Sequence, residues 1–222
     1  MLLSVMKNSF VFTYITLLGV SLITIIEALR TNNSEIRHIM NLESSVSLVA
    51  GLVYAMFVEA TKNMDMQQTI TEHELQNITQ MRYMDWAITT PLLLFTLLLF
   101  LTFNKRSIPL SKLALIIGLN YIMLLSGYLG ETRTVSYQVG FITGTTAFLL
   151  MLGVIYVEFV GESSRVHNVV FTMFSIIWSL YGVAYYVNGV PKQIMYNVLD
   201  AVAKGLFGVF LWLYFTKMIK IA

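Results

Sequence analysis

Two charged residues stand close together in the last apolar segment of this sequence. Asp200 and Lys204 are four residues apart among Val, Ala, Leu, Phe and Gly, so on a helix both would lie on one face. Charged side chains are costly within a membrane-spanning helix and by default indicate a functional site with a partner. A structural ion pair between two helices is the alternative interpretation, and a second charged segment would decide against it.

A matching pair of charges occurs in the third apolar segment. Arg82 and Asp85 are three residues apart and share a helix face with Trp86 and Thr89. Two carboxylates and two cations would then meet inside the protein, and their formal charges cancel. Such a set can hold a buried protonated amine or imine between two counter-ions, because carboxylates nearby offset the cost of burying a positive charge.

The composition is that of an integral membrane protein. Of the 222 residues 57% are hydrophobic and only 12% are charged, with a mean hydropathy of +0.72, whereas ordinary soluble domains carry roughly 25% charged residues. Cysteine is absent and the three histidines are scattered, so we predict no metal site. The net charge of +2 is too small to indicate a nucleic-acid partner.

Seven apolar runs reach the roughly 20 residues that span a bilayer. They predict an all-α membrane protein, a seven-transmembrane helix bundle that forms one domain over residues 1–222, with the lipid bilayer as partner. The longest polar connector is residues 61–80, and the first run lacks the features of a cleaved signal peptide. The runs cover residues 9–29, 38–60, 80–102, 109–129, 134–158, 166–187 and 192–218.

Basic residues outside the membrane orient this bundle. Eight lie in the connectors after the first, third and fifth runs or at the C-terminus, and four lie on the other side. The positive-inside rule then predicts an extracellular N-terminus and a cytoplasmic C-terminus. The first set is Arg30, Arg37, Lys105, Arg106, Lys112, Arg165, Lys217 and Lys220, and the second is Lys7, Lys62, Arg133 and Lys192.

Three motifs together resemble those of the microbial (type 1) rhodopsins. The third run reads RYMDWAITTPLLL from Arg82, the seventh contains DAVAK from Asp200, and the sixth contains WSLY from Trp178 to Tyr181. The motifs occur in the order of that family, and the resemblance covers all seven runs. It implies that Lys204 carries all-trans retinal as a Schiff base, with Asp85 as primary proton acceptor and Asp200 as second counter-ion.

The resemblance also implies which side chains surround the retinal. Trp86 and Trp178 match rings on either side of the polyene, and Tyr181 matches their neighbour on the sixth run. Tyr54 matches a residue that hydrogen-bonds the second counter-ion, and a leucine at position 93 favours green absorption. The complete predicted pocket is Tyr54, Trp86, Thr90, Leu93, Met123, Trp178 and Tyr181.

Two further residues would act on the acceptor. Thr89, one turn after Asp85, is expected to hydrogen-bond that carboxylate, and Arg82 is expected to respond when Asp85 becomes neutral. The sequence departs from the archaeal proton pumps at two positions of the proton relay. Thr96 stands where those pumps carry the inner proton donor, and Lys192 stands near the position of their outward release glutamate.

Polar residues of the second and seventh runs could form an ion path. Glu43, Ser47 and Tyr54 share one helix face, which places Glu43 on the cytoplasmic side of Tyr54 and facing Thr96. Asn197 lies one turn before Asp200 on the interior face. Glu43 is then a replacement proton donor or a gate carboxylate, or else it snorkels to the interface. The predicted ion path and gate consists of Arg82, Glu43, Ser47, Thr89, Thr96 and Asn197.

These departures favour a light-gated cation channel, and the chain looks most like the viral rhodopsins of giant algal viruses in their channel branch. An outward light-driven proton pump with Asp85 as acceptor is the alternative, and a sensory photoreceptor is the third hypothesis. In each case the protein is not an enzyme. The channel would pass monovalent cations or protons, as a homo-oligomer in the plasma membrane, of an infected host cell if the protein is viral.

Overall fold

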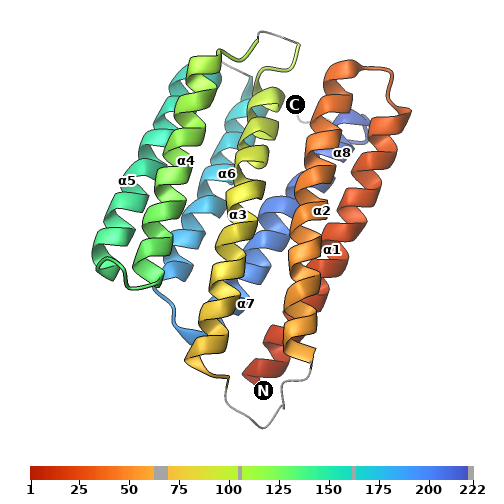
Figure 1. Ribbon diagram of the computed structural model, residues 1–222. Coiled ribbons are helices and arrows are strands. Elements are labelled where there is room, and N and C mark those ends of the chain that lie inside the picture. The colour runs from red at the N-terminus through yellow and green to blue at the C-terminus, as the bar shows by residue number, and fades with distance from the viewer. Residues whose placement is uncertain (63–69, 105–106, 162–163, 220–222) are drawn as a thin grey trace.

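The computed structural model describes residues 1–62, 70–104, 107–161 and 164–219. Its helices stand side by side as one bundle, with the two ends of the chain at opposite ends of it (Figure 1). Seven helical segments are long and apolar enough to cross a membrane, so the predicted seven-helix membrane bundle is confirmed. They are α1 (Leu2–Arg30), α2 (Ser34–Lys62), α3 (Glu72–Leu101), α4 (Leu110–Glu131), α5 (Tyr137–Ile155) continued by η1 (Tyr156–Val160), α6 (Arg165–Tyr185), and α7 (Gly189–Asp200) continued by η2 (Ala201–Leu206) and α8 (Phe207–Phe215).

The connector predicted over residues 61–80 was wrong in its extent. α2 continues to Lys62, and α3 begins at Glu72, so polar residues that suggested a loop form the first turns of α3. Thr71 accepts a hydrogen bond from the Glu74 amide while the Glu74 carboxylate accepts from the Thr71 amide, which is a capping box. Residues 63–69 of the predicted connector, and Lys105, Arg106 and Lys220 of the charge count, lie outside the described residues.

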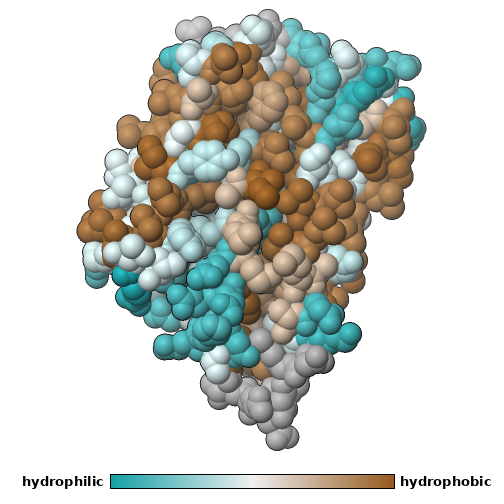
Figure 2. All heavy atoms as spheres, viewed as in Figure 1, coloured by the Kyte–Doolittle hydropathy of each residue, from teal (hydrophilic) through white to brown (hydrophobic). Residues whose placement is uncertain are grey.

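The outer surface of the bundle suits a hydrocarbon environment. Hydrophobic residues cover the flanks of the helices in the face that Figure 2 shows, and hydrophilic residues gather toward the ends. On α1, Phe12, Ile15 and Leu22 each expose 60% or more of their surface. In lipid these side chains contact acyl chains, so the polar residues of the spans are free to face inward.

The last span changes its helical geometry where the charged pair lies. α7 ends at Asp200 and the next six residues, including Lys204, form the π-helical segment η2 before α8 continues the span. Such π segments within longer helices are frequent at functional sites. η2 therefore marks the same residues that the charge pattern indicated.

Candidate functional site

Lys204 lies between two carboxylates that come from different helices. Its Nζ is 2.5 Å from Asp85 Oδ2 of α3 and 3.6 Å from Asp200 Oδ1 at the end of α7. All three side chains are fully buried. The two carboxylates thus neutralise the amine from two sides, as the charge pattern predicted.

Asp200 is held by a dense set of donors. Its Oδ1 accepts from the Tyr181 hydroxyl at 2.7 Å and from Trp86 Nε1 at 3.2 Å. Its Oδ2 accepts from the Tyr54 hydroxyl at 2.8 Å and from Arg82 Nη1 at 3.3 Å. These four hydrogen bonds stabilise the ionised form of Asp200, because a hydrogen bond to a charged acceptor is stronger than one to a neutral acceptor.

Arg82 uses all five of its N–H donors while buried to 1% exposure. Nη1 donates to the Tyr54 hydroxyl and to Asp200, and Nη2 donates to Asn197 Oδ1 at 2.7 Å. Nε and Nη2 both donate to Gln193 Oε1, at 3.3 and 3.1 Å. An arginine carries five donors and no acceptor, so this guanidinium is saturated.

Two amides on α7 extend this network to other helices. Asn197 Nδ2 donates to the Ser9 hydroxyl of α1 at 2.7 Å, and Gln193 Nε2 donates to Thr79 of α3 at 3.1 Å. Asn197 had been predicted on the interior face, and its full burial confirms that. Gln193 was missed, although its position one turn before Asn197 placed it on the same face.

Asp85 has a different environment from Asp200. Its Oδ2 contacts Lys204, whereas its Oδ1 has no hydrogen-bond partner among the described residues. The Thr89 hydroxyl donates to the backbone carbonyl of Asp85 at 2.9 Å, so the expected bond to the carboxylate was wrong. A helical threonine bonds readily to the carbonyl one turn back, and here that bond occupies its only proton.

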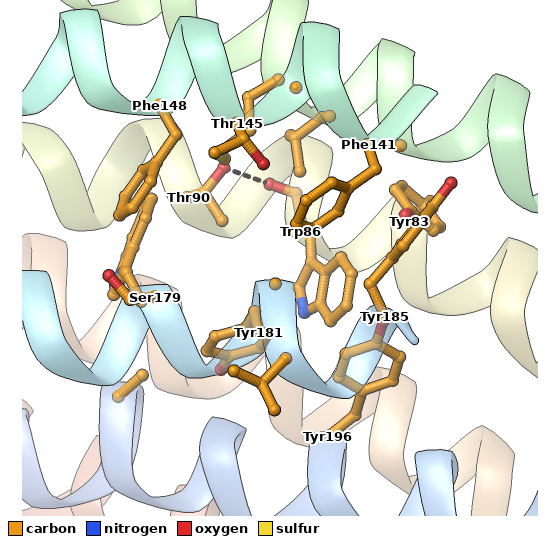
Figure 3. Close-up of a pocket in the computed structure, with 18 of the residues that line it drawn as sticks. Tyr83, Trp86, Thr90, Phe141, Thr145, Phe148, Ser179, Tyr181, Tyr185 and Tyr196 are labelled. Atoms are coloured by element: carbon orange, nitrogen blue, oxygen red, sulfur yellow. Dashed lines mark hydrogen bonds between the residues drawn. The ribbon is translucent and has the colours of Figure 1, made fainter. Parts of the chain in front are cut away.

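A cavity of about 500 Å³ ends at this charge cluster. Aromatic side chains surround it (Figure 3), and its lining includes both Asp200 and Lys204. Of the predicted pocket residues, Tyr54 does not line the cavity, because its hydroxyl lies behind Asp200 in the network with Arg82. The predicted residues that do line it are Trp86, Thr90, Leu93, Met123, Trp178 and Tyr181.

Several lining residues were not anticipated from the sequence. Tyr83, Tyr185 and Tyr196 approach the cavity from α3, α6 and α7, and Phe141 and Phe148 approach from α5. Phe141 and Phe148 are seven residues apart with Gly144 between them, which is a helical-face signal. This pattern contains no charged residue, so it does not distinguish side chains that line a cavity from side chains in ordinary helix packing.

Comparison with known proteins shows which family has this arrangement of helices. The family described as bacteriorhodopsin-like protein matches residues 5–218. The chain belongs to that family. A green-light absorbing proteorhodopsin from Gamma-proteobacterium EBAC31A08 is 32% identical over 155 residues, and this match spans 60% of this chain and 60% of that protein's length. Bacteriorhodopsin of Halobacterium salinarum is 29% identical over 182 residues, 74% of this chain and 68% of its own.

A solved structure is similar over nearly the whole chain. The crystal structure of viral rhodopsin OLPVRII superposes with a TM-score of 0.88 at 33% identity, covering 97% of this chain and 99% of that one. Xanthorhodopsin superposes with a TM-score of 0.76 at 21% identity, covering 95% and 92%, which shows the shared fold. The resemblance to microbial rhodopsins, including a viral member, is thereby confirmed.

Rhodopsins of this family bind retinal, whose all-trans isomer is the usual resting form. The cavity fits such a group on two observations of this chain. Its volume falls within the roughly 300–1,000 Å³ of ligand cavities, whose linings are mostly apolar with a few placed polar groups. Lys204 is the only lysine among the described lining residues, and its buried amine lies at the counter-ions.

Glu43 of this rhodopsin is buried and unpartnered. The residue is 0% exposed, and neither carboxylate oxygen has a hydrogen-bond partner among the described residues. Gly208 of α8 leaves room for it, because a Cβ at that position would lie 2.7 Å from Glu43 Oε1. The interpretation that Glu43 snorkels to the interface was therefore wrong. Ser47, one turn along, is equally buried, and its side chain faces the Glu43 carboxylate without meeting normal hydrogen-bond geometry.

The described residues of α3 from Trp86 to Leu101 include no titratable side chain. The Thr96 hydroxyl donates to the Leu92 carbonyl at 2.9 Å, so it is occupied within its own helix. The approach of Glu43 to Thr96 stays a prediction. Lys192 is also buried, and its Nζ lies 2.8 Å from Glu131 Oε1 of α4. The position near the pumps' release glutamate thus holds a paired cation.

Proposed function

We propose that this rhodopsin is a light-gated cation channel in which retinal is bound to Lys204 as a Schiff base. Asp85 is the primary proton acceptor and Asp200 the second counter-ion. The observation that carries this proposal is the burial of Glu43 without a partner on the face of α2 that also bears Ser47 and Tyr54. A cation path needs carboxylates and hydroxyls that water can reach once the bundle opens.

Retinal, when bound, supplies the absorption of light and the change of shape that starts the cycle. Asp85 Oδ2, 2.5 Å from Lys204 Nζ, is placed to accept a proton. Asp85 Oδ1 has no hydrogen-bond partner among the described residues, so fewer hydrogen bonds stabilise the ionised form of Asp85 than that of Asp200. The proton would come from the Lys204 nitrogen, so Lys204 and Asp85 would both lose their charge, and Arg82 and Asp200 would remain as the charged pair. Arg82 responds to that change, since it touches Asp200 directly.

The proposed path runs from this cluster along α2 and α7. Asn197 and Asp200 line its outer half, and Ser47 and Glu43 continue it inward. Beyond Glu43, a buried apolar cluster that includes Ile39, Met40, Leu97, Leu98 and Phe100 fills the inner end. Apolar constrictions close channels by excluding water, so this cluster would be the dark-state gate, with Glu43 at its edge.

An outward proton pump is the second candidate. The direct contact between Lys204 and Asp85 favours it, because proton transfer to Asp85 is the first step of such a pump. Thr96 cannot donate a proton at neutral pH, so Glu43 would have to return the proton from the inner side. In that case Glu43 would need to cycle between its two protonation states in every turnover.

Illuminated cells under voltage clamp separate the two candidates. A channel passes current down the electrochemical gradient, so the photocurrent is expected to change sign when the membrane voltage crosses the cation reversal potential. A shift of that potential when external cations are replaced would identify the conducted ion. Photocurrents that remain outward at every voltage would contradict the channel and support the pump.

Replacing Glu43 by Gln tests the proposed gate. We expect the photocurrent to fall about tenfold, the effect of roughly 1.4 kcal/mol on a barrier, because the path loses its inner carboxylate while the volume stays the same. Whole-cell photocurrent normalised to pigment is the measurement. Glu59→Gln is the matched control on α2, since the Glu59 side chain is 73% exposed. Equal currents in both variants would remove Glu43 from the path.

We further propose that residues 1–222 form one domain in the plasma membrane, with the N-terminus extracellular and the C-terminus cytoplasmic. The excess of basic residues on the C-terminal side supports this orientation. A homo-oligomer is proposed as the working assembly. Protease accessibility of a terminal tag in intact cells tests the orientation directly.

A further inference from the structure

A second cavity lies on the flank of the bundle, between α2 and α3. It has a volume of about 360 Å³ and is lined by His38, Asn41, Leu42 and Ser45 of α2 and by Phe95 and Leu99 of α3. The three polar residues are exposed, and the three apolar ones are half-buried. This cavity, which we call the α2–α3 groove, therefore has a polar side on α2 and an apolar side on α3.

The polar side of the α2–α3 groove reaches below the surface of the bilayer. α2 has 29 residues, so a helix of this length, about 43 Å at 1.5 Å per residue, extends about 6 Å at each end beyond a hydrocarbon core about 30 Å thick. Asn41 and Ser45 lie about 10 Å and about 16 Å from the first residue of α2, which is inside that core for a centred helix. Figure 2 shows hydrophilic side chains that extend from the upper end of the bundle down along α2.

The polar groups of this groove are available to a ligand. The Ser45 hydroxyl donates to the Asn41 carbonyl at 2.8 Å, and its oxygen can still accept a hydrogen bond. No hydrogen bond joins the Asn41 amide or the His38 ring to another of the described side chains. A polar group facing hydrocarbon costs free energy unless it is hydrogen-bonded, so a molecule that brings a polar group to this depth would be favoured.

Toward the middle of the bilayer the same helix faces are apolar. On α2, Leu48 and Leu52 follow Ser45 at helical spacing and expose 46% and 58% of their surface. On α3, Ile88 is 54% exposed and lies seven residues before Phe95, on the same face. A molecule with a polar head and an apolar tail would therefore match the α2–α3 groove and the surface that continues it.

A hydrogen bond between the two helices crosses the water-side end of the α2–α3 groove. Glu35 Oε2 accepts from the Asn104 backbone amide at 3.1 Å, which joins the start of α2 to the end of α3. Arg37 is exposed nearby on α2 and carries the charge opposite to that of Glu35. The described charges at this end cancel, so a headgroup without net charge fits better than an anion.

We propose that the α2–α3 groove binds a zwitterionic phospholipid. The phosphodiester of the lipid accepts hydrogen bonds from the Asn41 amide and the His38 ring, and one acyl chain lies along Phe95. Packed helices have axes about 8–10 Å apart, so the groove between them admits an acyl chain but not a further helix, which is about 10 Å wide with its side chains. This site does not depend on whether the protein is a channel or a pump.

Native mass spectrometry of the full-length protein in detergent tests this site. Dioleoyl phosphatidylethanolamine is titrated, and the intensity of the adduct with one lipid gives an apparent dissociation constant. Asn41→Leu removes the amide, and we expect binding to be about tenfold weaker, because a hydrogen bond to a charged group is lost. Thr146→Leu is the matched control, since Thr146 of α5 is also polar and exposed but does not line the α2–α3 groove.

A second variant and a second lipid keep the test decisive if Asn41→Leu does not fold. Ser45→Trp fills the groove and is expected to lose the adduct, whereas Leu52→Trp, on the same face beyond the groove, should retain it. A monogalactosyl lipid with the same acyl chains lacks the phosphate, so we expect it to bind about tenfold more weakly. Equal binding of the two lipids, or unchanged binding in the groove variants, would overturn the proposal. A loss of protein oligomers instead of lipid adducts in these variants would also overturn it and would assign the groove to a second copy of the chain.

Discussion

Lys204→Ala is expected to lose all visible absorbance when all-trans retinal is added. Retinal absorbs in the visible range only when it is joined to an amine that is held protonated, and Lys204 is the only lysine among the described residues of the cavity. The absorption spectrum of the purified variant is the measurement. Without this amine, retinal can still occupy the apolar space, so quenching of tryptophan emission by retinal is expected to persist, because Trp86 and Trp178 line the cavity.

A second lysine provides the control for that experiment. Lys192 lies on the same span, is also buried, and is paired with Glu131. Lys192→Ala removes a buried cation without touching the amine at the counter-ions, so the pigment should still form. A visible band in Lys204→Ala, or its loss in both variants, would contradict the proposed attachment site.

Asp200→Asn is expected to destabilise the protein more than Asp85→Asn. Each change leaves one uncompensated positive charge in the bundle, and breaking a buried ion pair costs about 3–5 kcal/mol. Asp200, however, touches both cations and accepts four side-chain hydrogen bonds. Asp85 has only its contact with Lys204, and that amine retains Asp200 nearby.

The temperature of thermal unfolding of the two apoproteins measures this difference. The full 3–5 kcal/mol is expected for Asp200→Asn, and a smaller loss for Asp85→Asn. Tyr181→Phe removes a single hydrogen bond to Asp200 and should cost about 1.5–3 kcal/mol. Equal losses in both aspartate variants would mean that the hydrogen bonds of Asp200 contribute nothing beyond its charge.

The seven spans and the charge cluster could be predicted because both depend on strong local signals. Apolar length determines a spanning helix, and a charged side chain inside such a helix must find a partner. That reasoning predicts that Arg82 and Asp85 lie together with Asp200 and Lys204. The start of α3 was misjudged for the complementary reason, since Glu72 and Glu74 are polar, and polarity alone does not distinguish a loop from a capped first turn.

The remaining features depend on three-dimensional neighbours that one sequence does not specify. Thr89 could have bonded to the Asp85 carboxylate or to its carbonyl, and helix geometry decided for the carbonyl. Gln193 is an ordinary polar residue until Arg82 is known to point toward it. The burial of Glu43 followed from the absence of a side chain at Gly208, which lies 165 residues away in the chain.

All five N–H donors of Arg82 are hydrogen-bonded, so the charge cluster resists small movements of the guanidinium group. A guanidinium that shifts slightly would lose one or two of its five bonds and leave buried donors without acceptors, and each such loss costs about 1.5–3 kcal/mol. Partial displacements are therefore disfavoured, because any larger movement of Arg82 would need new acceptors for its donors. Small fluctuations of Arg82 therefore do not break the cluster, and the charged pair of Arg82 and Asp200 is held in place by the same bonds.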